Sequence, residues 1–216
     1  MQLQLNQLSI QQGAHLFLSN INWDEFEQIL DELQEEGRLR ITYYEGMLEI
    51  MVPLPGHENR KEIIGDLVKA LLEELDIEFA PMGSSRFKRK LMKAGIEPDA
   101  CFYVQNEAAV RGMERIDLDV SPPPDLAIEI DITSDSQIKK DSYRALGVPE
   151  LWIYDGSSLE IYVLFEGQYM KTLRSQVFSN LPVSAVIPNY LSRSRVEGRN
   201  ALLKDFRHWV KNFLGK

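Results

Sequence analysis

The chain has 216 residues and a mass of 24.9 kDa, and 44% of its residues are hydrophobic. This composition is sufficient for the hydrophobic core of one α/β domain and does not favour extended disorder. The formal net charge of −9 argues against a protein that coats nucleic acid, because such binding depends on Lys and Arg side chains that neutralise phosphates. It does not exclude local contacts with DNA or RNA.

The first twenty residues lack the basic start and the uninterrupted apolar stretch of a signal peptide. No run of residues approaches the ~18 to 20 apolar positions that a membrane-spanning helix needs. The single cysteine, Cys101, rules out a disulfide within the chain and is typical of a reducing compartment. We therefore predict a cytoplasmic protein with no membrane partner.

Apolar residues within 23–33 recur at helical spacing behind a cap at Asn20 or Asn22. They predict a first helix, which Gly37 ends. Residues 41–51 then predict two short strands joined by a hairpin turn.

A second helix follows the proline-rich break at 53–56 and carries an apolar stripe that extends to Leu72. Beyond it the pattern changes to strands, which are separated by Gly83 and by Ala94-Gly95, and a polar, acidic loop covers 105–124. The strands of this region are predicted at 77–81, 84–92 and 98–104. The later elements are predicted as a strand at 125–131, a helix at 136–146, strands at 150–155, 159–165 and 167–173, and helices at 183–194 and 198–216. Neither a repeat nor a linker interrupts this pattern, which predicts a single domain over 1–216 with a helical C-terminal extension from about residue 180.

Two of these strands carry carboxylates on the face opposite their most apolar side chains. Successive side chains of a strand point to opposite faces. Asp99 therefore shares a face with Cys101 and Tyr103, and Glu129 shares one with Asp131. The other face of the second strand carries the run of Leu and Ile side chains between Leu126 and Ile130.

A carboxylate within an apolar strand is costly unless a partner balances its charge. A divalent metal ion is one such partner, since Mg²⁺ takes oxygen ligands from one or two carboxylates, water and substrate phosphates. Asp99 and Glu129 on adjacent strands would reach one ion, and the carbonyl of Ile130 would add a further oxygen. The alternative is that Glu129 pairs with a lysine or faces solvent at the edge of a sheet.

Lys139 lies on the helix that follows the Glu129 strand, behind caps available at 133–135. A lysine at this place would lie beside a phosphate, where it would orient a water molecule or neutralise charge in the transition state. Lys140 competes for this role, and exposed helix lysines are common. Lys139 shares a helix face with Tyr143, whereas Lys140 shares one with Arg144. The more apolar neighbour favours Lys139.

The segments EPD at 97–99 and PDLAIEIDITS at 124–134, followed by the stretch from Lys139 to Asp155 with GVPELW at 147–152, resemble the Uma-type family. This is a family of bacterial restriction-like endonucleases, formerly a domain of unknown function. The similarity extends over nearly the whole chain. It implies the PD-(D/E)XK nuclease fold, which is an α/β fold with a mixed β-sheet flanked by helices and a divalent-metal site.

The resemblance carries the motif Asp onto Asp99 and the motif Glu onto Glu129, and both would hold Mg²⁺ or Mn²⁺. The chain departs from the superfamily pattern at the third position, because Asp131 stands where the motif lysine normally lies. The Uma-type family supplies this lysine from the following helix, which implies Lys139. Asp131 then becomes a further metal ligand or a charge partner of Lys139.

Enzymes of this fold often add an acidic residue from an early helix to the metal site, which implies Glu58 or Glu62, and His57 would contact a phosphate. The alternative is that these residues are surface groups at a helix start, where acidic residues are favourable through the helix dipole. Cys101 has no companion that would make it a nucleophile, so we expect a packed thiol.

The basic residues cluster in two stretches that would hold a nucleic-acid backbone, or that would be solvated surface. The first stretch contains Arg86, Lys88, Arg89, Lys90 and Lys93. The second stretch is C-terminal and contains Arg193, Arg195, Arg199, Lys204, Arg207 and Lys211.

These features lead to the hypothesis of an endonuclease that uses Mg²⁺ or Mn²⁺, with DNA as substrate by resemblance and a homodimer as its assembly. One alternative is a nuclease-fold module that no longer cuts and instead binds nucleic acid or protein. Another is a purely structural α/β domain.

Overall fold

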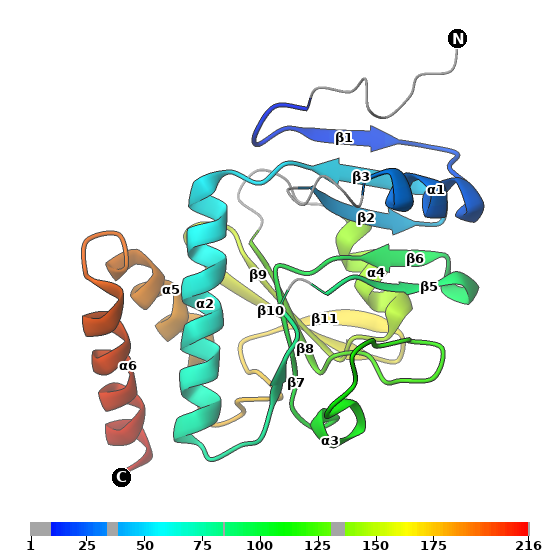
Figure 1. Ribbon diagram of the computed structural model, residues 1–216. Coiled ribbons are helices and arrows are strands. Elements are labelled where there is room, and N and C mark those ends of the chain that lie inside the picture. The colour runs from blue at the N-terminus through cyan, green and yellow to red at the C-terminus, as the bar shows by residue number, and fades with distance from the viewer. Residues whose placement is uncertain (1–9, 34–38, 84, 131–136, 216) are drawn as a thin grey trace.

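The computed structural model describes residues 10–33, 39–83, 85–130 and 137–215. Its first sheet has the strand order β1-β3-β2-β6-β5, and all of its pairings are antiparallel (Figure 1). These strands are β1 (His15–Leu18), β2 (Arg40–Tyr44), β3 (Met47–Met51), β5 (Phe87–Arg89) and β6 (Ala94–Ile96).

The second sheet has the order β11-β10-β9-β8-β7-β4 and is mixed, because β8 and β9 are parallel while the other pairs are antiparallel. These strands are β4 (Ala80–Pro81), β7 (Ala100–Tyr103), β8 (Leu126–Ile130), β9 (Glu150–Tyr154), β10 (Leu159–Phe165) and β11 (Gln168–Thr172). The expectation of an α/β fold with a mixed β-sheet flanked by helices is confirmed, with the difference that the strands divide between two sheets.

The helices are α1 (Trp23–Leu33), α2 (Pro55–Glu74), α3 (Glu107–Val110), α4 (Gln137–Leu146), α5 (Val183–Arg193) and α6 (Arg199–Leu214). Asn22 caps α1, since its Oδ1 accepts a hydrogen bond from the Glu25 N–H at 3.0 Å and its own N–H donates one to Glu25 Oε2 at 2.8 Å. In Figure 1, α2, α5 and α6 lie together on one side of the second sheet, while α4 lies on the other and contacts β2 and β6. No helix among the described residues is both long and apolar enough to cross a membrane.

Four expectations about secondary structure are wrong. Ala94-Gly95, expected as a break, begins β6, because this strand pairs with both β2 and β5. The strand expected at 77–81 is limited to Ala80–Pro81. In the described part of the strand expected at 84–92, which is 85–92, only Phe87–Arg89 forms a strand, and a 3-10 helix follows at Lys90–Met92. The loop expected at 105–124 contains α3. Gly37 lies outside the described residues.

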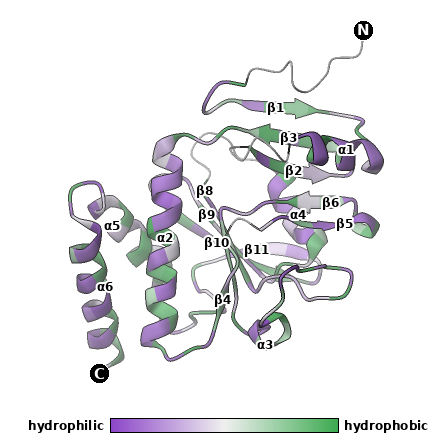
Figure 2. Ribbon diagram, viewed as in Figure 1, coloured by the Kyte–Doolittle hydropathy of each residue, from purple (hydrophilic) through white to green (hydrophobic). Residues whose placement is uncertain are grey.

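The two faces of the second sheet bury different sets of side chains. Phe102 and Ile128 belong to the hydrophobic cluster that includes residues of α2, α5 and α6. Cys101 and Ala127 belong to a second cluster, which includes Tyr143 of α4. Figure 2 shows hydrophilic and hydrophobic stretches alternating along α2 and α6, as is typical of amphipathic helices packed on a core. The expected alternation in β7 and β8 is therefore confirmed, and it directs the carboxylates of both strands into the layer beneath α4.

Candidate active site

Asp99 and Glu129 lie opposite each other on neighbouring strands. Ala100 pairs with Ile128 in the antiparallel register of β7 and β8, and one step further along this register brings Asp99 opposite Glu129. Both side chains are buried, with exposures of 2% and 3%. Asp99 Oδ2 accepts a hydrogen bond of 2.7 Å from the backbone N–H of Ile130. The strand pairing thus places two carboxyl groups side by side in the interior.

Helix α4 supplies the partners of Glu129. Lys139 Nζ lies 3.0 Å from Glu129 Oε2, and Tyr143 donates its hydroxyl hydrogen to Glu129 Oε1. Lys139 is 5% exposed, whereas Lys140 lies with its Nζ 4.8 Å from the centre of the Tyr162 ring. Lys139 is therefore the lysine that faces the acid pair, and the Lys139–Tyr143 helix face is the one turned inward.

The partners of Asp99 come from α2 and β2. His57 Nε2 lies 3.1 Å from Asp99 Oδ2, and Arg40 Nε lies 3.8 Å from Asp99 Oδ1. Arg40 also forms ion pairs with Glu97 at 2.9 Å and Glu58 at 3.3 Å. The buried acids and bases therefore form one connected group rather than isolated charges, which is how charge is tolerated in an interior.

Burial and neighbouring charge act in opposite directions on Asp99 and His57. Burial alone raises the pKa of Asp99, but its contact with His57, the charge of Lys139 and the N–H of Ile130 bring that pKa below its ordinary value. Burial alone lowers the pKa of His57, but its contact with Asp99 and the charges of Asp99, Glu129 and Glu58 raise it overall. The pKa values of the two groups are thus displaced in opposite directions, that of Asp99 downward and that of His57 upward.

Glu129 shows the opposite behaviour. Burial raises its pKa to about 7, and the charge of Asp99 adds to this rise, although Lys139 and the Tyr143 hydroxyl both act to lower it. Two adjacent buried carboxyl groups with pKa values displaced in opposite directions are a common mark of a functional site.

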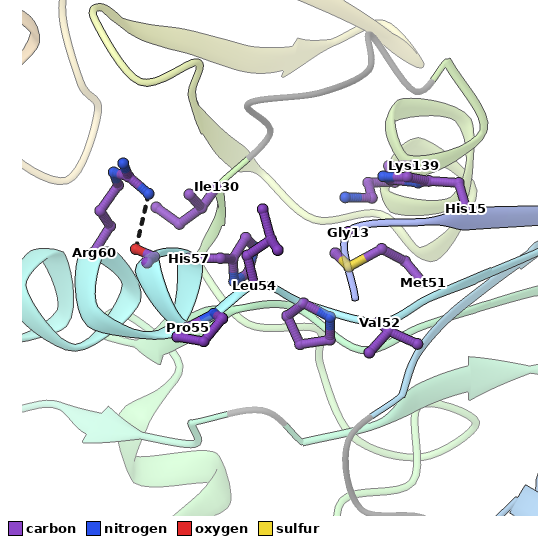
Figure 3. A pocket seen from close by; sticks show the side chains of 12 residues that line it. Gly13, His15, Met51, Val52, Leu54, Pro55, His57, Arg60, Ile130 and Lys139 are labelled. Carbon is purple, nitrogen blue, oxygen red and sulfur yellow. Dashed lines mark hydrogen bonds between the residues drawn. The ribbon is translucent and has the colours of Figure 1, made fainter. Parts of the chain in front are cut away.

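A pocket of about 380 Å³ opens beside this group (Figure 3). His57, Ile130 and Lys139 line it, and its other walls come from α2, from the residues before α2 and from the chain around β1. A smaller pocket of about 140 Å³ is lined by Asp99 together with Glu62 of α2. The acid pair and its partners therefore lie between two openings.

The structure places the remaining candidate metal ligands as follows. The Glu58 side chain is 40% exposed and pairs with Arg40 and with Lys61. Asp131 and the capping residues at 133–135 lie outside the described residues. Among the residues that are described, no group of three or more His, Cys, Asp or Glu side chains is arranged to hold a metal ion.

Four of the five residues of the first basic stretch, all but Lys93, form ion pairs among the described residues. Arg86 pairs with Glu97 at 3.4 Å, Arg89 with Asp119 at 3.3 Å and Lys90 with Asp24 at 3.2 Å. Lys88 pairs with Glu27. A phosphate contact by these side chains would have to replace an existing ion pair.

Four of the six residues of the C-terminal stretch are engaged in the same way, and one of them is Lys211, which pairs with Glu74 at 3.5 Å. Arg193 pairs with Glu197 and Asp205, Arg199 with Asp66, and Arg207 with Glu73 and Glu74. These pairs join α6 to α2 and to α5.

Sequence reasoning missed Arg40 and the hydroxyl of Tyr143 as members of the group. Arg40 begins a strand of the other sheet, and its sequence position carries no signal of proximity to Asp99. Tyr143 is recognisable only as an apolar neighbour of Lys139. Its hydrogen bond to Glu129 depends on how closely α4 lies over β8. Cys101 is fully buried, and burial raises the pKa of its thiol to about 12, as expected of a packed side chain.

A mixed sheet between helical layers, with a buried Asp–Glu pair and a lysine against it, defines an α/β protein with a buried acid–base group. The chain matches the family model Uma2, described as "Putative restriction endonuclease", over residues 23–194, and it belongs to this family. None of the curated proteins matches it. A solved structure of "a putative nuclease belonging to DUF820" from Anabaena variabilis is 16% identical, with a TM-score of 0.49, over 70% of this chain and 90% of that chain.

Proposed function

We propose that the protein is an endonuclease that hydrolyses phosphodiester bonds in DNA with the help of Mg²⁺ or Mn²⁺. The observation that carries this proposal is the buried pair of Asp99 and Glu129, with Lys139 Nζ 3.0 Å from Glu129. Such a pair serves no packing purpose, because burying charge costs free energy that apolar side chains would not.

The donor atoms in this group fit a small divalent ion. Asp99, Glu129 and the Ile130 carbonyl offer only oxygen, and Mg²⁺ is usually held by one or two carboxylates, with water and substrate phosphate completing its shell. The charge of Asp99 contributes to the raised pKa of Glu129, because two neighbouring carboxylates repel each other. A cation held by both carboxylates would offset this repulsion. When bound, the ion would lower the pKa of a coordinated water and offset charge on the phosphate.

The chain's own groups then have distinct roles. The Ile130 N–H and His57 hold the Asp99 carboxylate in position. Tyr143 fixes one oxygen of Glu129. Lys139 offsets the negative charge that develops when a phosphate is attacked. Asp131, which follows β8 directly, remains a candidate ligand by resemblance.

The paired state of the basic stretches bears on the alternative of a module that binds without cutting. Such a module would rely on exposed, unpaired Lys and Arg to neutralise phosphates. Eight of the eleven Lys and Arg residues of the two basic stretches are held in ion pairs among the described residues. The catalytic proposal is favoured because its key residues are buried together, where a binding surface would be exposed.

Cleavage of supercoiled and linear DNA with Mg²⁺ or Mn²⁺ tests the proposal. We expect metal-dependent cleavage by the wild type and a loss of at least about 10²-fold in the rate for Asp99→Asn, Glu129→Gln and Lys139→Ala. Glu166→Gln, an exposed residue between β10 and β11, is the matched control and should cut normally.

Cleavage that survives both carboxylate substitutions, or that is absent with either metal, would contradict the proposal. An RNA substrate in the same assay decides between the two nucleic acids. Analytical ultracentrifugation tests the homodimer, which is expected because many enzymes of this fold pair to cut two strands.

A further inference from the structure

The 380 Å³ pocket is lined by basic side chains, although it opens beside the acid pair of Asp99 and Glu129. Its lining includes His15, His57, Arg60 and Lys139, and no acidic residue is among the described residues that line it. Figure 3 shows Arg60 and His57 on the α2 side of the pocket, with Lys139 and His15 across from them. The bases thus stand on the pocket side of the group, while Asp99 and Glu129 lie behind them.

Arg60 differs from the arginines of the two basic stretches. It donates a hydrogen bond of 2.8 Å to the carbonyl of Gly56, drawn in Figure 3, and it forms no ion pair within the part of the chain that the structure describes. A guanidinium group has five N–H donors. Arg60 therefore keeps both its charge and most of its donors for a ligand.

Two further features of the pocket point to an anion. Helix α2 is 20 residues long and begins at Pro55, so that its positive end lies in the pocket wall. His57 is 6% exposed, and its Nδ1 lies 3.6 Å from Glu58 Oε1, beyond hydrogen-bond distance. A buried histidine in the pocket lining, beside a helix N-terminus and an arginine without an ion pair among the described residues, fits a phosphate group.

The rest of the lining is apolar and would suit a nucleoside. Met51, Val52, Pro53 and Leu54 form one wall, and the pocket volume lies within the ~300 to 1,000 Å³ that small-ligand sites occupy. None of the described lining residues is a Phe, Tyr or Trp that would stack on a base, or an Asn or Gln whose amide would read a base edge.

We propose that this pocket binds one nucleoside monophosphate unit, with its phosphate at Arg60 and the N-terminus of α2 and its sugar and base against the Met51–Leu54 wall. The ligand class rests on the proposed function. The unit comes either from the 5′-phosphorylated end of a strand or from a free nucleotide, because both offer the same phosphate and nucleoside. Apolar contact with the Met51–Leu54 wall makes the pocket indifferent to the base.

Calorimetric titration of the full chain with thymidine 5′-monophosphate, in buffer with EDTA, tests the inference without any cleavage step. We expect saturable binding that weakens about tenfold or more in Arg60→Gln, because a hydrogen-bonded charge contact is lost. Arg60→Lys should recover part of the affinity. Arg174→Gln, an exposed arginine outside the pocket lining, is the matched control and should bind like the wild type.

Thymidine and inorganic phosphate, each titrated alone, should bind more weakly than the monophosphate. Equal binding of phosphate and the monophosphate would overturn the nucleoside part of the proposal, and undiminished binding by Arg60→Gln would overturn the site. A 5′-phosphorylated oligonucleotide that binds more tightly than the monophosphate identifies a strand end as the source, and weaker binding identifies the free nucleotide.

The two proposals fail separately. A protein that cuts DNA but binds no nucleotide in EDTA retains the proposed function and loses this inference. A protein that binds the monophosphate through Arg60 but does not cut DNA loses the proposed function and keeps the pocket.

Discussion

Glu129 is surrounded by groups that act on its charge in opposite directions. Burial and the charge of Asp99 disfavour the ionised carboxylate, whereas Lys139 and Tyr143 favour it, and the result is a pKa raised from 4.5 to about 7. The contribution of Glu129 to the free energy of unfolding therefore depends on pH between about 4.5 and about 7.

The free energy of unfolding should fall as the pH rises from about 4.5 to about 7 in metal-free buffer. A folded-state pKa above the unfolded value means that the native protein binds the proton more tightly. The stabilisation that Glu129 contributes is complete below its pKa in the unfolded chain and is lost as the pH rises through its pKa in the folded protein. Glu129→Gln should flatten this slope in denaturant melts with EDTA, and a slope equal to that of the wild type would show that another group is responsible.

Tyr143→Phe should raise the pKa of Glu129 further, because the hydroxyl hydrogen bond is one of the groups that lower it. We expect the acidic limb of the cleavage pH profile to move to higher pH. The free energy of unfolding should fall by about 1 to 3 kcal/mol, since a buried acceptor loses its donor. Tyr162→Phe is the control, because Tyr162 donates to the partly exposed Glu160, and it should leave the profile in place.

At the scale of elements, α1 and β6 approach each other through Gly95. A Cβ atom at this position would lie 2.7 Å from Phe26 Cζ, too close for any real contact. The backbone carbonyl of Gly95 also lies 3.4 Å from the Ser142 hydroxyl of α4. This glycine therefore allows β6 to lie between α1 on one side and α4 on the other.

Gly95→Ala should reduce the free energy of unfolding by about 1 to 3 kcal/mol, because an added methyl group must displace a packed ring. The matched control is Gly65→Ala in α2, where the new Cβ would meet its nearest neighbour, Lys69, at 4.0 Å. That change should stabilise the protein by about 0.5 to 1 kcal/mol through helix propensity. Urea denaturation of both variants gives the comparison, and equal effects would contradict this account of β6.

Strand β6 shows why the sequence pattern did not predict some elements. A glycine and an alanine have low strand propensity, and residues 94–96 are extended because they are paired on both sides by strands distant in sequence. In contrast, β8, α4 and β9 were predicted to within one or two residues, because their apolar periodicity is strong.

At the scale of the whole molecule, the family match ends at residue 194, before α6 begins. Nevertheless Leu202, Phe206 and Val210 of α6 are completely buried in the cluster that covers one face of the second sheet. The C-terminal helix is thus part of the main core, and the single domain over 1–216 stays a prediction.

Phe206→Ala should lower the free energy of unfolding by about 3 to 5 kcal/mol, the usual cost of emptying a buried aromatic site. Phe213→Ala on the same helix is the control, because Phe213 is 50% exposed, and it should cost less than about 1 kcal/mol. Circular dichroism and tryptophan fluorescence should report one coincident transition in each variant. A separate transition for the C-terminal helices would show that they form an independent unit.

The sequence by itself determined which residues carry the chemistry in this proposal. Alternation in two apolar strands assigns Asp99 and Glu129 to a common face, and helical spacing puts Lys139 with Tyr143. These are local geometric consequences of strand and helix periods, which hold in any fold.

Only the tertiary structure decided what surrounds these residues. Arg40 meets Asp99 because two sheets pack together, and Lys88 and Arg199 pair with acids distant in sequence. Arg60 lines a pocket and forms no ion pair among the residues that the structure describes. Such relations depend on distances between elements, and periodicity along a chain carries no information about which elements meet.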